Sequence, residues 1–174
     1  MWCRGLIAGF VFVVIVAGCT GLDVQVSANE DFAALKTLTM QDVRGNPVAF
    51  ADLVGKKVIV VSFWATFCKP CLGEMPFLQK MHDAHKNEGL AVIGISLDTV
   101  ETEAYVLPFL DANGYTYTVC IDRQSDAANL LNPKSVLPYL LIFDKEGRLN
   151  YRKDGFSTGD QPDLQKRIEE LLKP

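Results

Sequence analysis

The feature that most restricts the fold is a strand-like run at residues 58–64, which reads Val-Ile-Val-Val-Ser-Phe-Trp. Ser62 is its only small polar residue, and the other positions are β-branched or aromatic. A half-exposed strand would alternate between apolar and polar residues, so this continuous run indicates a central strand that is buried on both faces. We therefore expect a sheet that is covered on both sides.

The segments on either side of this run alternate between strand-like and helix-like patterns. Turn residues at 42–47 separate two short apolar stretches and predict an N-terminal hairpin. Further strands are expected at 90–97, 115–121, 139–143 and 149–153, and helices at 68–87, 101–112, 125–131 and 160–172. This order predicts an α/β fold with a central mixed β-sheet flanked by helices.

The first residues have the layout of an export signal. Arg4 precedes an apolar run at residues 6–17, which is too short to span a membrane comfortably and is typical of a secretory leader. The residues before Cys19, Val-Ala-Gly, resemble the lipobox of bacterial lipoproteins, in which the leader is cut before a cysteine that becomes acylated. An uncleaved anchor helix and an ordinary secretory leader are the alternatives, and all three place the body of the protein outside the cytoplasm.

The expected organisation has three parts. A lipoprotein signal peptide occupies residues 1–18, a tether of small, polar and acidic residues occupies 19–33, and one globular domain occupies 34–174. Hydrophobic residues make up 49% of the chain, enough for one full core. The net charge of −4, without a basic stripe, gives no reason to expect binding to nucleic acid.

The five cysteines differ in their expected roles. Cys68 and Cys71 form a Cys-x-x-Cys pair at the predicted start of a helix, where unpaired backbone N–H groups and the helix dipole favour a thiolate. Because the thiolate is the form that attacks a disulfide, we expect Cys68 to be the nucleophile and Cys71, one turn further on, to resolve the product. Cys3 lies in the leader, and Cys120 is expected to be a small buried residue.

Metal binding is another possible use of the Cys-x-x-Cys pair. A zinc site needs four ligands, and neither a second cysteine pair nor a suitable Cys/His pair completes such a set. Cu(I) binding by the two thiolates stays open as a non-catalytic alternative. His82 and His85 lie three residues apart on a predicted helix, but without a third ligand they are expected to be surface or boundary residues. We therefore expect no metal site.

The residues around the pair resemble those of a known family. The segment 61–71 reads Val-Ser-Phe-Trp-Ala-Thr-Phe-Cys-Lys-Pro-Cys and is followed by Glu74 and Pro76. This pattern closely resembles the thioredoxin superfamily, in particular its TlpA/ResA-type membrane-anchored members with a redoxin or AhpC/TSA-like domain, and the resemblance extends over residues 35–172. It implies a thioredoxin-like fold with an N-terminal β-hairpin and an inserted βα element, thiol–disulfide oxidoreductase activity, and no cofactor.

The resemblance also implies roles for single residues. Pro138 matches the family's cis-proline, which lies against the disulfide and positions a substrate, and Trp64 and Pro70 complete the expected substrate-positioning set. Glu74 matches an acidic residue that takes a proton from the resolving thiol. Ordinary thioredoxin uses an aspartate on the preceding strand for this purpose, and here Ser62 stands in its place.

The function that this resemblance implies is the reduction of disulfides in exported proteins, with apocytochrome c as one candidate substrate. Such a reductase draws electrons from a membrane donor of the thiol-transfer type. Its lipid anchor would hold it in the cell envelope, on the periplasmic side in a Gram-negative cell.

Formation of disulfides by the same pair is one alternative, because the direction of electron flow depends on the reduction potential. A peroxidase of the same fold is another, although Trp64 stands where the peroxidase motif needs proline.

Overall fold

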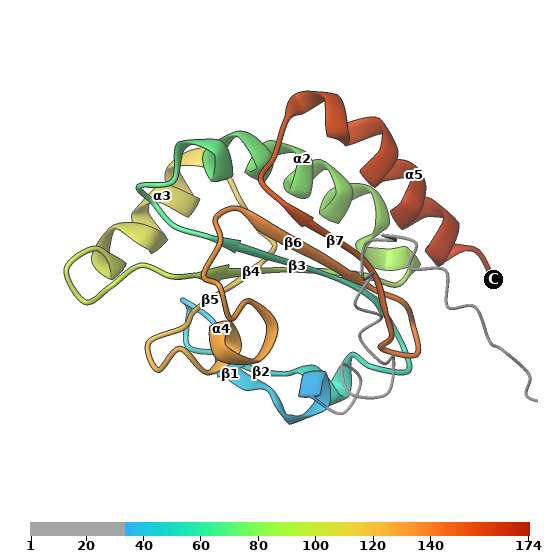
Figure 1. The fold of residues 1–174 in the computed structure, drawn as a ribbon, viewed down its shortest axis with the longest axis horizontal. Helices are drawn as coiled ribbons and strands as arrows, with labels where there is room; N and C mark the ends of the chain where they lie inside the picture. Colours follow the sequence, from blue (N-terminus) through green and yellow to red (C-terminus); the bar gives the residue numbers. More distant parts are fainter. Residues whose placement is uncertain (1–33) are drawn as a thin grey trace, which may run out of the picture.

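The computed structural model describes residues 34–174. The expected signal peptide, the tether and the acylated Cys19 lie outside the described residues, so these assignments stay predictions. Within the described part, the chain forms a five-stranded mixed sheet, a separate two-stranded hairpin sheet, and helices on both faces of the larger sheet. This arrangement confirms the predicted α/β fold class (Figure 1).

The central strand of the larger sheet is β3 (Val58–Trp64). On one side lie the parallel strands β4 (Leu90–Ser96) and β5 (Thr118–Ile121). On the other side β6 (Tyr139–Phe143) pairs antiparallel with β3, and β7 (Leu149–Asp154) pairs antiparallel with β6. The carboxyl ends of β3, β4 and β5 therefore meet at one edge of the sheet, where open α/β folds place their binding sites.

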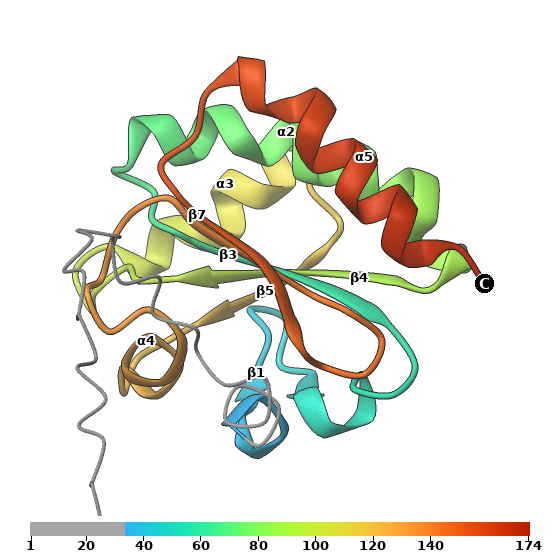
Figure 2. The same cartoon turned by 45° about the vertical axis from the view of Figure 1, so that its right-hand side comes forward.

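Helices and the hairpin form layers on opposite faces of the sheet (Figures 1 and 2). One face carries α2 (Lys69–His85), α3 (Val106–Asn113) and α5 (Gln161–Leu172). The other face carries α4 (Asp126–Leu131) and the hairpin of β1 (Thr39–Gln41) and β2 (Pro47–Ala49). In the part of the chain that the structure describes, no helix is both long and apolar enough to cross a membrane.

All seven residues of β3 are buried. Val58, Val60 and Trp64 belong to the core beneath α2 and α5, whereas Ile59 and Phe63 belong to the core beneath α4 and the hairpin. Successive side chains of a strand point to opposite faces, so both faces of β3 must be apolar. Each fully buried side chain of this kind contributes about 1.5–3 kcal/mol. This two-sided burial is the reason why residues 58–64 show no alternation.

The strand expected at 115–121 is shorter in the structure, because β5 begins only at Thr118. The backbone N–H of Thr116 donates to the Gln79 side chain of α2 (2.8 Å), and that of Tyr115 donates to the carbonyl of Leu110 in α3 (3.0 Å). These backbone groups are therefore engaged by the two helices. They do not pair with β4.

Two further element boundaries differ from the prediction. Residues 34–37 are helical, so only the end of the apolar stretch before the turn residues 42–47 enters the hairpin, as β1. The helix expected from residue 101 becomes α-helical only at Val106. Before it, the carbonyl of Thr99 accepts hydrogen bonds from the backbone N–H groups of Thr102 and Glu103, which closes a separate turn.

Gly94 in β4 has no side chain, and neighbouring side chains fill the space where one would lie. A Cβ atom at this position would lie 3.1 Å from Trp64 Nε1 and 3.2 Å from a methyl group of Val119. We expect Gly94→Ala to lower the free energy of unfolding by about 1–3 kcal/mol, because an extra methyl group in a dense core forces side chains to shift.

Gly73→Ala is the matched control. Nothing lies within 4 Å of its added Cβ, so alanine should stabilise α2 by about 0.5–1 kcal/mol. Equal stability of Gly94→Ala and the wild type in chemical denaturation would contradict the close packing around Gly94.

Candidate active site

Cys68 and Cys71 are joined by a disulfide at the start of α2, with their Cα atoms 5.3 Å apart. Cys68 is the N-cap residue of this helix, and its sulfur accepts a hydrogen bond from the backbone N–H of Cys71 (3.3 Å). Cys68 is 9% exposed, whereas Cys71 is completely buried. Cys68 therefore keeps a small exposed area, whereas Cys71 has none.

The sequence starts α2 at this place for two reasons. Cys68 has an extended backbone conformation, as an N-cap residue requires. Pro70 follows in the first turn, where its fixed φ suits a helix and its missing N–H group is not needed. The free N–H groups of this turn and the helix dipole would stabilise a thiolate at Cys68 when the disulfide is reduced.

Glu74 lies one turn after Cys71 on the buried face of α2 and is 1% exposed. The equally buried Ser62 of β3 donates a hydrogen bond from its hydroxyl to Glu74 Oε2 (2.6 Å). Burial raises the pKa of Glu74 to about 7, the hydrogen bond from Ser62 opposes this rise, and the charge of Asp160 adds to it. A carboxyl group with such a pKa can accept or release a proton near neutral pH.

Asp98 fixes the segment that leads from β3 to Cys68. Its carboxyl oxygens accept hydrogen bonds from the backbone N–H of Thr66 (2.9 Å), from the hydroxyl of Thr66 (2.5 Å) and from the hydroxyl of Ser96 (2.7 Å). Asp98 is itself 4% exposed. The end of β4 is therefore bonded directly to the residue two positions before Cys68.

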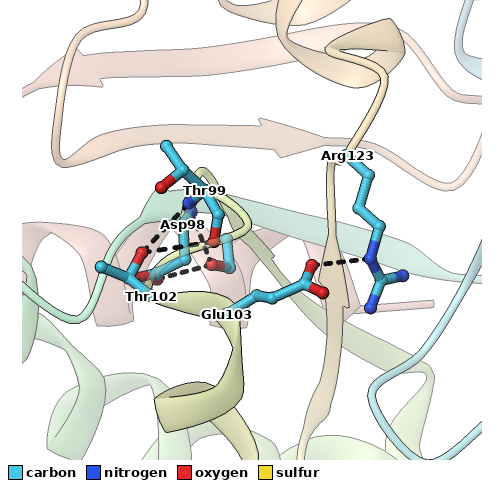
Figure 3. Close-up of polar contacts among 6 residues, drawn as sticks. Asp98, Thr99, Thr102, Glu103 and Arg123 are labelled. Atoms are coloured by element: carbon cyan, nitrogen blue, oxygen red, sulfur yellow. Dashed lines mark hydrogen bonds and ion pairs between the residues drawn. The ribbon is translucent and has the colours of Figure 1, made fainter.

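The residues after Asp98 form a compact polar turn (Figure 3). The backbone N–H of Thr99, the residue after Asp98, donates to the hydroxyl of Thr102 (3.1 Å). Glu103 forms an ion pair with Arg123, which follows β5 (2.7 Å). The turn thereby links the carboxyl ends of two neighbouring strands.

The Leu137–Pro138 peptide bond is cis, the isomer that the resemblance implies. Tyr139, the first residue of β6, pairs with Phe63, so Pro138 lies next to the carboxyl end of β3, the end that leads to Cys68. The structure thus places Pro138 on the same edge of the sheet as the disulfide. Its contact with a substrate stays a prediction.

Polar side chains anchor the segment before Pro138. The carboxylate of Asp122, directly after β5, accepts hydrogen bonds from the first backbone N–H groups of α4, those of Ala127 and Ala128 (3.2 and 2.7 Å). At the other end of α4, the side-chain amide of Asn132 bonds to both the N–H and the carbonyl of Val136 (3.1 and 2.9 Å).

Trp64 does not fit the expected direct role in substrate positioning. Its side chain is completely buried and packs against Phe109 of α3, with the ring centroids 5.8 Å apart. A side chain without exposed surface cannot contact another protein, so Trp64 supports the site from the core. Pro70, the other expected positioning residue, is exposed beside the disulfide, and Phe67 is 63% exposed.

The remaining candidates form no second centre among residues 34–174. Cys120 is a buried free thiol in β5, and burial raises its pKa to about 12, which makes it unreactive near neutral pH. His85 pairs with Glu88 (2.7 Å), and burial lowers the pKa of His82. This part of the chain holds no group of three or more His, Cys, Asp or Glu residues that could bind a metal ion.

Asp98, which bonds to the loop before Cys68, and Asp122, which bonds to the first turn of α4, were not among the residues singled out from the sequence. Both stand directly beyond the carboxyl ends of predicted strands, which the structure shows to be parallel, at the edge where open α/β folds place their sites. A polar residue at such a strand end was the signal that could have found them. The contact of Ser62 with Glu74 had no comparable signal, because it joins two elements whose relative position only the fold defines.

Comparison with known proteins agrees with this geometry. Residues 32–152 match the model of the AhpC/TSA family. The thiol-disulfide oxidoreductase ResA of Geobacillus kaustophilus is 29% identical over 132 residues, which cover 76% of this chain and 72% of the relative. ResA of Bacillus thuringiensis (strain Al Hakam) is 32% identical over 122 residues, which cover 69% and 67% of the two chains.

The fold is also shared with a solved structure. A Chlorobium tepidum protein described as a thiol:disulfide interchange protein, DsbE, superposes with a TM-score of 0.71 and 25% identity, over 78% of this chain and 93% of that one. The disulfide at the start of α2 lies on the same sheet edge as the cis-proline in this chain. The chain belongs to the AhpC/TSA family, as a TlpA/ResA-type member of the thioredoxin superfamily and a thiol–disulfide oxidoreductase.

Proposed function

We propose that this oxidoreductase is a membrane-tethered, extracytoplasmic disulfide reductase whose nucleophile is Cys68. The observation that carries the proposal is the unequal exposure of the pair, since Cys68 reaches the surface and Cys71 is completely buried. Of the two cysteines, only Cys68 has any exposed area that a disulfide in another protein could reach. The buried Cys71 is placed to react with the sulfur of Cys68.

The proposed reaction transfers two electrons from the dithiol to a substrate disulfide. The Cys68 thiolate attacks one substrate sulfur, the substrate S–S bond breaks, and the first substrate thiolate leaves and takes up a proton. Cys71, once deprotonated, attacks Cys68 Sγ, and the mixed disulfide breaks. The second substrate thiolate then leaves and is protonated. The Cys68–Cys71 disulfide is the oxidised product, which is the form in the structure.

Glu74 is the proposed acceptor of the Cys71 proton. Cys71 is shielded from water, so its deprotonation needs a group inside the protein. Glu74 follows three residues later on the same buried helix face, a spacing that makes the two side chains neighbours. Its raised pKa suits the transfer of a proton near neutral pH, and Ser62 holds its carboxylate in one orientation.

Each cycle leaves the pair oxidised, so the reductase needs a supply of electrons. We propose a membrane protein of the thiol-transfer type as the donor, and disulfides of exported proteins, including apocytochrome c, as substrates. The Lys69-Pro70 dipeptide between the cysteines supports this direction, because it resembles the Xaa-Pro dipeptides of reductases more than the Pro-His of strong oxidants. Attachment through an acylated Cys19 is the proposed tether, and the mass of the N-terminal peptide from membranes tests it.

Exchange of Cys71 for serine should trap the reaction at its intermediate. Without the resolving thiol, Cys71→Ser should accumulate a disulfide-linked complex with a disulfide-bonded probe such as insulin, visible on a non-reducing gel. Cys68→Ser is the matched control and should form no such complex. If Cys68→Ser formed the complex and Cys71→Ser did not, the order of the two thiols would be the reverse of the proposed one.

The reduction potential of the Cys68–Cys71 pair tests the direction of electron flow. Equilibrated against defined thiol buffers, the protein should have a potential near or below about −230 mV, as thioredoxin-like reductases do. A value near about −120 mV would instead identify a protein that forms disulfides, and the proposed direction would be wrong.

The pH dependence of the resolving step should report the ionisation of Glu74. As the pH rises through about 7, the carboxyl group becomes a proton acceptor, and resolution of a preformed mixed disulfide should accelerate. Glu74→Gln keeps the size of the side chain but cannot take the proton. We expect it to slow resolution about a hundredfold and to lose the inflection near pH 7.

The pH dependence of stability supplies a control, because ionisation of Glu74 should lower the stability of the protein while it accelerates the resolving step. The folded protein holds the Glu74 proton more tightly than the unfolded chain does, because the pKa is raised from 4.5 to about 7. The oxidised wild type should therefore lose stability as the pH rises through this range, and Glu74→Gln should lack that contribution. An identical kinetic pH profile in the wild type and in Glu74→Gln would remove Glu74 from the mechanism.

A further inference from the structure

Asp98 is a buried carboxyl group that the proposed reaction does not use. A buried carboxyl group is costly unless hydrogen bonds satisfy it, and Asp98 accepts three, two of them from Thr66. The third donor, Ser96, also accepts a hydrogen bond from the backbone N–H of Asp98 (3.0 Å), which fixes the carboxyl group to the end of β4. Asp98 and Thr66 therefore form a rigid connection between β4 and the loop before α2.

This connection acts on the backbone that carries the nucleophile. Thr66 stands two residues before Cys68, whose backbone N–H donates to the carbonyl of Ala65 (3.0 Å). The carbonyl of Trp64 in turn accepts a hydrogen bond from the N–H of Leu97 (2.8 Å). The loop from β3 to Cys68 is thus bonded to the end of β4 at two successive points. Of these two connections, the hydrogen bonds between the Asp98 side chain and Thr66 are the one nearer to Cys68.

The reduced protein depends on this connection more than the oxidised protein does. In the oxidised form the disulfide to Cys71 fixes the position of Cys68. Reduction removes that bond, and the preceding backbone must then keep Cys68 at the N-terminus of α2. Stabilisation of a charge by the helix N-terminus falls off within one turn, so even a small displacement would reduce it.

We propose that Asp98 is a positioning residue for the Cys68 nucleophile. Through Thr66 it keeps Cys68 at the N-cap of α2 in the reduced protein, where the thiolate is stabilised. The chain continues from Asp98 into the polar turn of Figure 3, where Glu103 forms an ion pair with Arg123, beyond the end of β5. This inference rests on the proposed function, in which Cys68 is the attacking thiol.

The rate of alkylation of Cys68 by iodoacetamide, measured against pH in the reduced full chain, tests the inference. Peptide mass identifies which cysteine is modified. Asp98→Ala removes the acceptor for both Thr66 donors and also a negative charge, whose loss by itself would lower the pKa of Cys68. We expect the lost hydrogen bonds to outweigh the lost charge and to raise this pKa by about one unit, which lowers the thiolate fraction about tenfold below the pKa. Asp98→Asn removes the same charge but keeps an oxygen for the Thr66 N–H and an amide for its hydroxyl, so it should not raise the pKa. A rise in Asp98→Asn equal to that in Asp98→Ala would overturn the inference.

Two further variants separate positioning from a general loss of stability. Asp122→Ala removes a comparable buried carboxylate at the end of the next strand, whose hydrogen bonds go to α4, and it should leave the pKa of Cys68 unchanged. An equal shift in Asp122→Ala would show that the effect is not specific to Asp98. Thr66→Val removes only the hydroxyl bond and should raise the pKa by part of the Asp98→Ala shift, which keeps the test decisive if Asp98→Ala fails to fold.

The same experiment distinguishes failure of the inference from failure of the proposed function. The proposed function requires that wild-type Cys68 is alkylated faster than Cys71 near neutral pH. Equal rates for the two thiols would overturn that function. A faster Cys68 whose pKa is the same in the wild type and in Asp98→Ala would overturn only the positioning role of Asp98.

Discussion

The burial of β3 on both faces is the constraint on which the rest of the structure depends. Because every side chain of this strand is buried, β3 is fixed in the middle of the sheet, and its carboxyl end has a defined position at the sheet edge. The next residues lead directly to Cys68 and the N-terminus of α2. The position of the reactive pair therefore follows from the buried central strand, and the two cysteines differ in exposure, since Cys68 is 9% exposed and Cys71 is completely buried.

Several polar side chains around this junction are buried or partly buried and form hydrogen bonds across it. Ser62 and Glu74 connect β3 to α2 beneath the disulfide, and Asp98 and Thr66 connect β4 to the loop above β3. A buried hydrogen bond contributes little net stability, about 0.5–1.5 kcal/mol, but an unpaired partner would cost more. Such pairs therefore favour one arrangement of strand, loop and helix over its alternatives, which is what a site with two closely spaced thiols requires.

The sequence was sufficient to predict the central strand, the disulfide pair at a helix start and the order of most elements, because each depends on local patterns of residues. It was insufficient where a group that is distant in the sequence determines the local structure. Tyr115 and Thr116 have strand-like neighbours, yet α3 and α2 bind their backbone N–H groups. Trp64 was expected to help position a substrate, and its burial follows from the packing of α3 over β3. Asp98 belongs to the same group, since its contact with Thr66 spans 32 residues of sequence.

Glu74 shows how opposing effects can set a chemical property. Burial alone would favour the neutral carboxyl group, the charge of Asp160 adds to that preference, and the hydrogen bond from Ser62 favours the carboxylate. The balance leaves the pKa near neutrality, where the proton is held neither firmly nor weakly. A group of this kind can take the Cys71 proton when the pair is oxidised and return it when the pair is reduced, so it assists both directions equally. The direction of electron flow must then come from the relative stability of the dithiol and the disulfide, which depends on how well the N-terminus of α2 stabilises the Cys68 thiolate.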